Sequence, residues 1–183
     1  MVALTTPQYE AIVSAIRDGY GSTRPNPKVA TALVAEANLG IRIGDILRLR
    51  LCDFIFDGDR IRLDITEEKT GKTRRFTVPQ EVYDFLRDYA RARKIADDAI
   101  IFPFSSRAVQ IRIKDACEHL GFTDISTHSF RKWYATDIYN KSGHDLALVQ
   151  HLLQHSSPVT TRRYIGIDED KVEEAIANHV HIA

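Results

Sequence analysis

Five side chains of this sequence carry functional groups suited to chemistry at a phosphate. They are two arginines, two histidines and a tyrosine, spread over most of the chain: Arg42, His128, Arg131, His155 and Tyr164. A guanidinium is a planar, permanently charged fork that matches phosphate oxygens, and an imidazole donates a hydrogen bond or moves a proton near neutral pH. A phenol can act as a covalent nucleophile when its surroundings stabilise the phenolate. The set predicts attack by Tyr164 on a phosphodiester, and hence strand exchange in DNA.

Three short segments hold these residues. They are Leu39-Gly-Ile-Arg-Ile-Gly-Asp45, His128-Ser-Phe-Arg131 and His155-Ser-Ser-Pro-Val-Thr-Thr-Arg-Arg-Tyr164. The i to i+3 spacing of His128 and Arg131 places both on one helix face, and a helix N-terminus itself attracts phosphate. The isoleucines around Arg42 indicate a partly buried site, where a guanidinium needs an anionic partner. Asp45 is a candidate for such a partner in a purely structural pair.

In order and approximate spacing, these residues resemble the tyrosine recombinase, or phage integrase, family. The segment from Leu39 to Leu47 is similar to the family's first motif, including an acidic residue three positions after the arginine. The segment from Leu152 to Tyr164 is similar to its last motif, except that Gln154 stands where a glycine usually precedes the histidine. The match runs from about residue 27 to 168, so the resemblance implies a catalytic domain of this family.

The resemblance implies a role for each of the five residues. Arg42 and Arg131 would clamp the non-bridging oxygens and stabilise charge on phosphorus, with a further hydrogen bond from His155. His128 would accept the proton of Tyr164 or orient the phosphate. Tyr164 would become a 3′-phosphotyrosine that retains the bond energy, so that a second 5′-hydroxyl rejoins the strand without ATP. No metal ion and no cofactor are implied.

Expulsion of the 5′-alkoxide also requires a proton donor. In the resembling family, a lysine in the turn between the second and third strands has this role. Lys69, in Glu68-Lys69-Thr70-Gly71, matches that pattern more closely than its rival Lys72. We therefore expect Lys69 to be the general acid, with an ordinary solvated turn lysine as the alternative interpretation for both.

Charge along the chain is uneven although its sum is zero. The 183 residues are enough for one domain with a real core. Residues 60–75 contain six basic and three acidic side chains, whereas residues 168–174 contain five acidic side chains and one lysine. A local basic surface matters more for DNA binding than the total. We expect Lys72, Arg74 and Arg75 to contact the backbone of a double-stranded recombination site.

Several other classes of protein are disfavoured. Two isolated cysteines, Cys52 and Cys117, are too few for a disulfide framework or a zinc site. The first residues do not resemble a signal peptide, and no apolar run approaches membrane-spanning length, so a cytoplasmic location is expected. A metal-dependent hydrolase would have to use His144, His151 and His155, which have no well-placed carboxylate or cysteine beside them.

Hydrophobic periodicity and turn residues predict an α+β fold, mostly helical with a small three-stranded antiparallel sheet. Asp57-Gly-Asp59 between alternating apolar residues is a strong hairpin signal. Asn26 is the expected cap of the second helix and Gly40 its stop, which leaves Arg42 just past a helix end. The expected strands are 53–56, 60–66 and 75–78, and the expected helices are 6–18, 26–38, 44–48, 80–94, 107–120, 128–139, 146–154, 159–164 and 168–178.

Members of the resembling family usually carry a DNA-clamping helical domain before the catalytic one. Here one short helix precedes the first motif, so residues 1–183 are interpreted as the catalytic domain alone, either an excised fragment or a naturally minimal protein. We expect weak DNA binding by this chain alone and assembly of protomers on DNA, as a tetramer. The tail, residues 168–183, would pack on a neighbouring protomer or on its own core. The alternatives are a type IB topoisomerase-like nicking-closing enzyme and a non-catalytic DNA-binding accessory protein.

Overall fold

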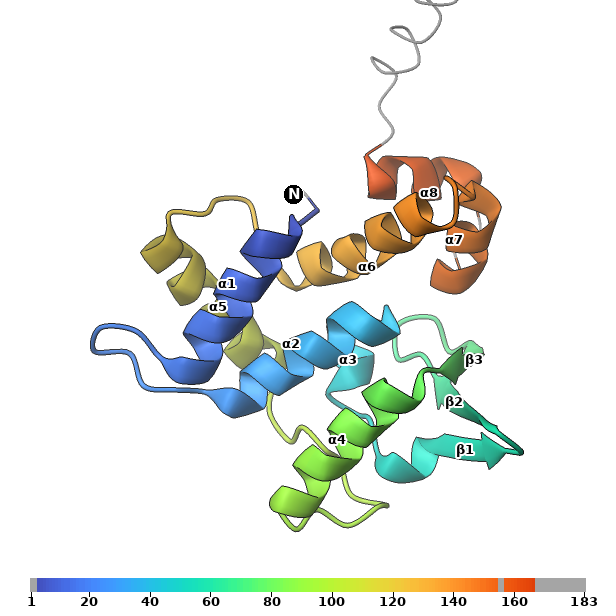
Figure 1. Ribbon diagram of the computed structural model, residues 1–183, viewed down its shortest axis with the longest axis horizontal. Helices are drawn as coiled ribbons and strands as arrows, with labels where there is room; N and C mark the ends of the chain where they lie inside the picture. Colours follow the sequence, from blue (N-terminus) through green and yellow to red (C-terminus); the bar gives the residue numbers. More distant parts are fainter. Residues whose placement is uncertain (1–2, 155–156, 167–183) are drawn as a thin grey trace, which may run out of the picture.

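The computed structural model describes residues 3–154 and 157–166, and it is a helical body with one three-stranded sheet (Figure 1). This confirms the predicted α+β fold. The expected tail helix at 168–178 and His155 lie outside the described residues. The elements are α1 (Thr6–Asp18), α2 (Pro27–Leu39), α3 (Ile43–Ile46), a 3-10 turn (Leu51–Asp53), β1 (Phe54–Asp57), β2 (Arg60–Thr66), β3 (Thr73–Val78), α4 (Gln80–Ala92), α5 (Ser106–Leu120), α6 (Thr127–Lys141), α7 (Leu146–Leu153) and α8 (Pro158–Ile165).

Local signals fix both ends of α2 and so the position of Arg42. The Asn26 side chain accepts a hydrogen bond from the backbone N–H of Val29, as expected of an N-cap. Gly40 ends the helix in the left-handed conformation, with φ at 60°. A Cβ at this position would lie 2.2 Å from the Tyr134 ring, so only glycine fits. The chain therefore turns sharply after α2, and Arg42 becomes the N-cap residue of α3.

The strands pair antiparallel in the order β1-β2-β3, as the two turn signals predict. Leu63 in the middle strand lies opposite Phe54 on one side and Phe76 on the other. Phe54, Ile61, Leu63 and Val78 are buried in the core. The third strand begins at Thr73, two residues before the predicted start, and this earlier start brings Arg74 into the strand, on the same face as Phe76 and Val78.

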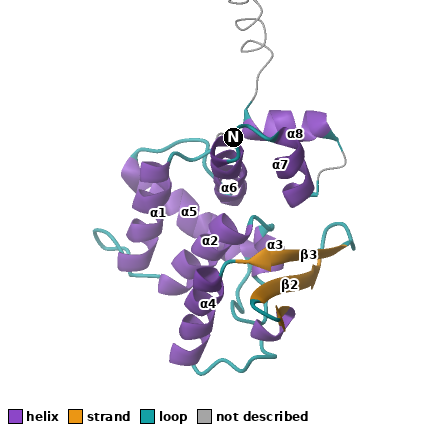
Figure 2. Cartoon of the chain, turned by 45° about the vertical axis from the view of Figure 1, so that its right-hand side comes forward, coloured by secondary structure: helices purple, strands orange, loops and turns teal. Residues whose placement is uncertain are grey.

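Buried apolar side chains form two clusters, and α6 contributes to both. The larger cluster joins helices α1, α2 and α5 to the sheet and includes Phe130 of α6. The smaller one contains Ala135, Val149 and Leu153, with Tyr164 packed against it. Figure 1 shows α7 and α8 gathered at the C-terminal end of α6, and Figure 2 shows both of them away from α4. Arg131 follows Phe130 directly and therefore lies where the two clusters meet.

Neither cysteine is paired, and Cys117 is buried while Cys52 is exposed. Within residues 3–154 and 157–166, no three His, Cys, Asp or Glu side chains gather as metal ligands. A metal site built on His144 and His151 would thus need a ligand from elsewhere, such as His155. The helices of this described part include none long and apolar enough to cross a membrane.

Candidate active site

Arg42 reaches the site from the turn between α2 and α3. Its Nη1 donates a hydrogen bond to Oε2 of Glu67 over 2.7 Å. The Arg42 side chain keeps 25% of its surface exposed, whereas Glu67 keeps only 2%. Asp45, the partner considered from the sequence, instead accepts a hydrogen bond from the backbone N–H of Glu68 at 2.8 Å. The buried carboxylate of Glu67 therefore holds the Arg42 guanidinium in place, while part of the Arg42 side chain still faces solvent.

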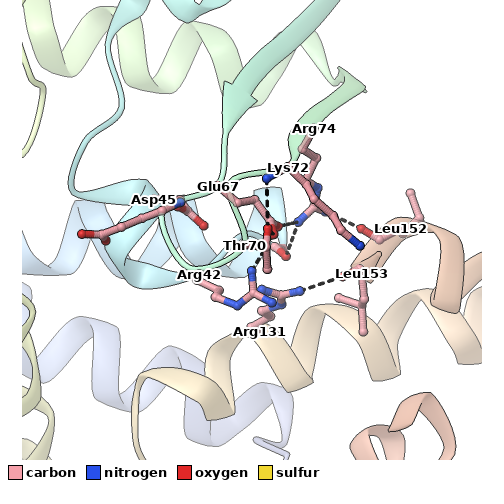
Figure 3. Close-up of polar contacts among 11 residues, drawn as sticks. Arg42, Asp45, Glu67, Thr70, Lys72, Arg74, Arg131, Leu152 and Leu153 are labelled. Carbon is pink, nitrogen blue, oxygen red and sulfur yellow. Dashed lines mark hydrogen bonds and ion pairs between the residues drawn. The ribbon is translucent and has the colours of Figure 1, made fainter. Parts of the chain in front are cut away.

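Arg131 enters the same site from the first half of α6. It is buried, and its Nη2 donates to the carbonyl oxygen of Leu153 over 3.0 Å. Its Nε has no acceptor among the described residues. Burial lowers the pKa of Arg131, and the charge of Arg42 lowers it further. The guanidiniums of Arg42 and Arg131 are thus close enough to repel each other, and Figure 3 shows them near one another. Such a pair of cations is suited to bind an anion.

Tyr164 comes to these arginines from α8. It is partly buried against the small cluster, and Nζ of Lys132 lies 5.5 Å from the centre of its ring. Burial raises the pKa of Tyr164 to about 12, while the charges of Arg131 and Arg42 act in the opposite direction. The structure therefore brings the predicted nucleophile and the predicted phosphate clamp into one electrostatic environment, from helices far apart in the sequence.

His128 and Lys69 belong to the same environment. Desolvation lowers the pKa of His128, and the charges of Arg131, Lys69 and Arg42 lower it further. Lys69 is exposed in the turn between β2 and β3, and its rival Lys72 is exposed in the same turn. Lys72 lines a cleft of about 460 Å³ between β3 and α7, together with Arg75 and His151.

The structure corrects the expectation that Arg74 contacts DNA. Because β3 begins at Thr73, strand alternation turns Arg74 inward and Arg75 outward. Arg74 is 2% exposed, and it donates to the carbonyl oxygens of Gly40, over 3.3 Å, and Leu152 (Figure 3). Burial lowers its pKa to about 10. Arg75 is exposed and pairs with Asp64, so contact with DNA stays a prediction for Arg75 and Lys72.

Two buried carboxyl groups near the arginines were not predicted from the sequence. Glu36 of α2 is 1% exposed and accepts a hydrogen bond from the backbone N–H of Ile43. Burial raises its pKa well above the ordinary value, against the charge of Arg131. The other is Glu67. Glu36 could have been recognised as a buried residue, because it is an acidic residue inside the apolar run of α2. Glu67 could not, because it stands beside Glu68 at the end of a strand, where acidic residues are ordinary.

Gln154 ends α7 in the left-handed conformation, with φ at 53°. Its backbone N–H donates to the carbonyl oxygens of Gln150 and His151. Residues with a Cβ adopt this conformation at a cost, which glycine avoids. The structure thus gives a physical reason for the glycine that usually stands here in the resembling motif. His155, the next residue, lies outside the described part of the chain.

The chain belongs to the phage integrase family, whose model matches residues 3–171. It is 34% identical over 143 residues to YoeC of Bacillus subtilis (strain 168), named a probable integrase/recombinase, covering 75% of this chain and 77% of YoeC. It is 32% identical over 148 residues to the tyrosine recombinase XerC of Bradyrhizobium diazoefficiens, covering 76% of this chain and 46% of XerC. The chain therefore spans about half the length of that XerC.

Solved structures share this fold. The XerH site-specific recombinase bound to a palindromic difH substrate aligns with a TM-score of 0.69 and 21% identity, over 96% of this chain and 52% of XerH. A lambda integrase dimer bound to a COC′ core site aligns with a TM-score of 0.68 and 21% identity, over 90% of this chain and 59% of that chain. At this level of identity the likeness establishes the fold alone.

Proposed function

We propose that this chain is the catalytic domain of a site-specific DNA recombinase or integrase, which cleaves and rejoins strands through a 3′-phosphotyrosyl intermediate. The observation that carries the proposal is the convergence of Arg42, Arg131 and Tyr164, which come from three different elements and lie close enough for the two guanidiniums to lower the pKa of the phenol. Membership of the phage integrase family supports the same conclusion.

In the proposed reaction, Arg42 and Arg131 bind the non-bridging oxygens of the scissile phosphate and stabilise the charge that develops there. The Oη of Tyr164 forms a bond to phosphorus, and the bond from phosphorus to the 5′-oxygen breaks. Because the pKa of Tyr164 is about 12 without DNA, its phenol is neutral at physiological pH and must lose its proton during the attack.

Two further residues are proposed to move protons. His128 accepts the phenolic proton, and its lowered pKa keeps the ring in the neutral form that can accept one at pH 7. Lys69 gives a proton to the departing 5′-oxygen. In the reverse of this step, a free 5′-hydroxyl of a second strand attacks the phosphorus of the phosphotyrosine. The bond from phosphorus to Tyr164 breaks, a phosphodiester is restored and Tyr164 is freed. His155 is proposed to add a hydrogen bond to the phosphate.

The proposed partner is a double-stranded recombination site, on which several protomers assemble in the cytoplasm, as a tetramer. Two exposed residues are proposed to contact its backbone, Lys72 in the turn before β3 and Arg75 on the side of β3 that faces away from the core. The recombinase XerH and lambda integrase were both solved on DNA sites. Those complexes support DNA as the partner of this fold without indicating which sequence this chain recognises.

Covalent trapping tests the proposal. The chain is incubated with a pool of short nicked duplexes of randomised sequence, in which cleavage near the nick releases a small fragment and prevents religation. A protein–DNA adduct that survives denaturing electrophoresis and is lost on proteolysis is expected. A complete lack of adduct from a folded, DNA-binding chain would instead favour an accessory protein, and relaxation of supercoiled DNA without exchanged strands would favour a topoisomerase-like enzyme.

A further inference from the structure

Glu67 is a buried carboxylate at the junction of three residues of the site. It directly follows β2, and its side chain is 2% exposed. Its Oε2 accepts hydrogen bonds from Nη1 of Arg42 at 2.7 Å and from the hydroxyl of Thr70 at 2.8 Å. Its Oε1 lies 3.7 Å from Nη1 of Arg74. Figure 3 shows Arg42, Thr70 and Arg74 around this one carboxylate.

The backbone of Glu67 also closes the turn that carries Lys69. Its N–H donates to the carbonyl oxygen of Lys72 at 3.0 Å, and its carbonyl oxygen accepts from the N–H of Gly71 at 2.9 Å. The next residue, Glu68, is tied through its N–H to the carboxylate of Asp45 in α3. The lysine turn and the segment that carries Arg42 are therefore joined at two separate points.

Burial alone would raise the pKa of Glu67. The hydrogen bonds from Arg42 and Thr70, and the charges of Arg42 and Arg131, outweigh that effect and leave the pKa below its ordinary value. Glu67 is consequently ionised at neutral pH. Its negative charge offsets the repulsion among Arg42, Arg74 and Arg131 when no phosphate is present.

We infer that Glu67 is a positioning residue, which holds the Arg42 guanidinium and the Lys69 turn in one fixed relation around the scissile phosphate. The inference rests on the proposed function, in which Arg42 binds phosphate oxygens and Lys69 protonates the leaving oxygen. A guanidinium has five N–H donors, and Glu67 engages Nη1, so the rest of the exposed fork is left for substrate. The hydroxyl of Thr70, in the same turn as Lys69, donates to the Glu67 carboxylate and so fixes its position.

Thr70 provides the cleanest test, because its side chain is exposed and its replacement should not unfold the protein. Thr70→Val keeps the shape and removes the hydroxyl, whereas Thr70→Ser keeps the hydroxyl. We measure single-turnover cleavage at saturating concentrations of a duplex recovered by covalent trapping, and the melting temperature of each variant. Thr70→Val should cleave about fivefold more slowly at an unchanged melting temperature, and Thr70→Ser should restore most of the rate.

A second substrate separates positioning from general structural damage. In a 5′-bridging phosphorothiolate, the leaving thiolate needs no proton, so the part of the defect that arises from a displaced Lys69 should disappear. The slowing by Thr70→Val should therefore be smaller on this substrate. Glu67→Gln keeps the size of the side chain but removes its charge. It should slow cleavage of the ordinary duplex on the order of tenfold, while the DNA concentration that gives half-saturation should stay nearly unchanged.

The inference is overturned if Thr70→Val and Glu67→Gln cleave at the wild-type rate, or if Thr70→Val slows both substrates by the same factor. These results differ from a failure of the proposed function. In that case the wild-type chain itself forms no adduct with either substrate.

Discussion

The guanidinium of Arg131 on α6 donates from Nη2 to the carbonyl oxygen of Leu153, the last residue of α7, over 3.0 Å. The carbonyl groups at the end of a helix have no partner within it and carry partial negative charge. The neighbouring carbonyl, of Leu152, accepts a hydrogen bond from Arg74. Arg131, which is proposed to bind the phosphate, thus also fixes the end of the helix that precedes the Tyr164 segment.

Replacement of either clamp arginine by lysine should impair chemistry more than binding. Arg42→Lys and Arg131→Lys keep the charge but lose the planar fork, and loss of such transition-state contacts costs on the order of a hundredfold or more in rate. Single-turnover cleavage at saturating DNA measures this effect. Arg75→Ala should instead weaken DNA binding and lower its salt dependence. Near wild-type cleavage by Arg42→Lys would refute its assignment as a phosphate clamp.

Lys69→Ala should slow cleavage strongly, and a 5′-bridging phosphorothiolate should restore much of the rate. A thiolate leaves without protonation, so this substrate bypasses a missing general acid. Lys72→Ala is the matched control, because both lysines are exposed in the same turn. If the phosphorothiolate substrate restores the rate of Lys72→Ala and not that of Lys69→Ala, then Lys72 is the general acid and Lys69 is not.

Arg74→Ala should destabilise the protein by about 3–5 kcal/mol, because it leaves two buried carbonyl oxygens without their donor and removes one of the two cations paired with the buried Glu67. Arg75→Ala should cost less than about 1 kcal/mol, since the pair of Arg75 with Asp64 is at the surface. Urea denaturation gives the free energy of unfolding for both. Wild-type stability of Arg74→Ala, with weakened DNA binding, would restore the original expectation that Arg74 contacts DNA.

Gln154→Gly should stabilise the protein by about 0.5–1 kcal/mol, because glycine adopts the left-handed conformation without strain. Ala147→Gly, at the exposed second residue of α7, is the control and should destabilise the protein by less than about 1 kcal/mol. Both changes are measured by urea denaturation. A loss of stability in Gln154→Gly would mean that the glutamine side chain contributes more than its backbone conformation costs.

Much of the fold was predictable from local signals. The Asn26 cap, the Gly40 stop and the Asp57-Gly-Asp59 turn each act over a few residues, and the structure contains all three features. The start of β3 was misplaced, because Thr73 and Arg74 lack the apolar character by which a strand is recognised. Arg74 was expected at the surface because of its basic neighbours, and its place inside the strand, on the inward face, was not foreseen.

The candidate site was only partly predictable. Arg42, Arg131 and Tyr164 could be chosen because their side chains have distinctive chemistry and their motifs resemble a known family. Glu67 could not, because its importance comes from tertiary contacts with Arg42 and Arg74 that no sequence spacing encodes. Asp45 was considered as the partner of Arg42 because it is the nearest carboxylate in the sequence. In the folded chain the partner is Glu67, and Asp45 accepts a hydrogen bond from the backbone of Glu68 instead.

The central claim is that Tyr164 is the nucleophile, and mass spectrometry of the trapped adduct tests it most directly. After digestion of protein and DNA, we expect a nucleotide attached to the peptide that contains Tyr164. Tyr164→Phe, which keeps the ring packed against α6 and α7, should form no adduct and bind DNA with nearly unchanged affinity. Tyr134→Phe, which alters another partly buried tyrosine, should still form it. An adduct on a different residue, or one that persists in Tyr164→Phe, would contradict the account.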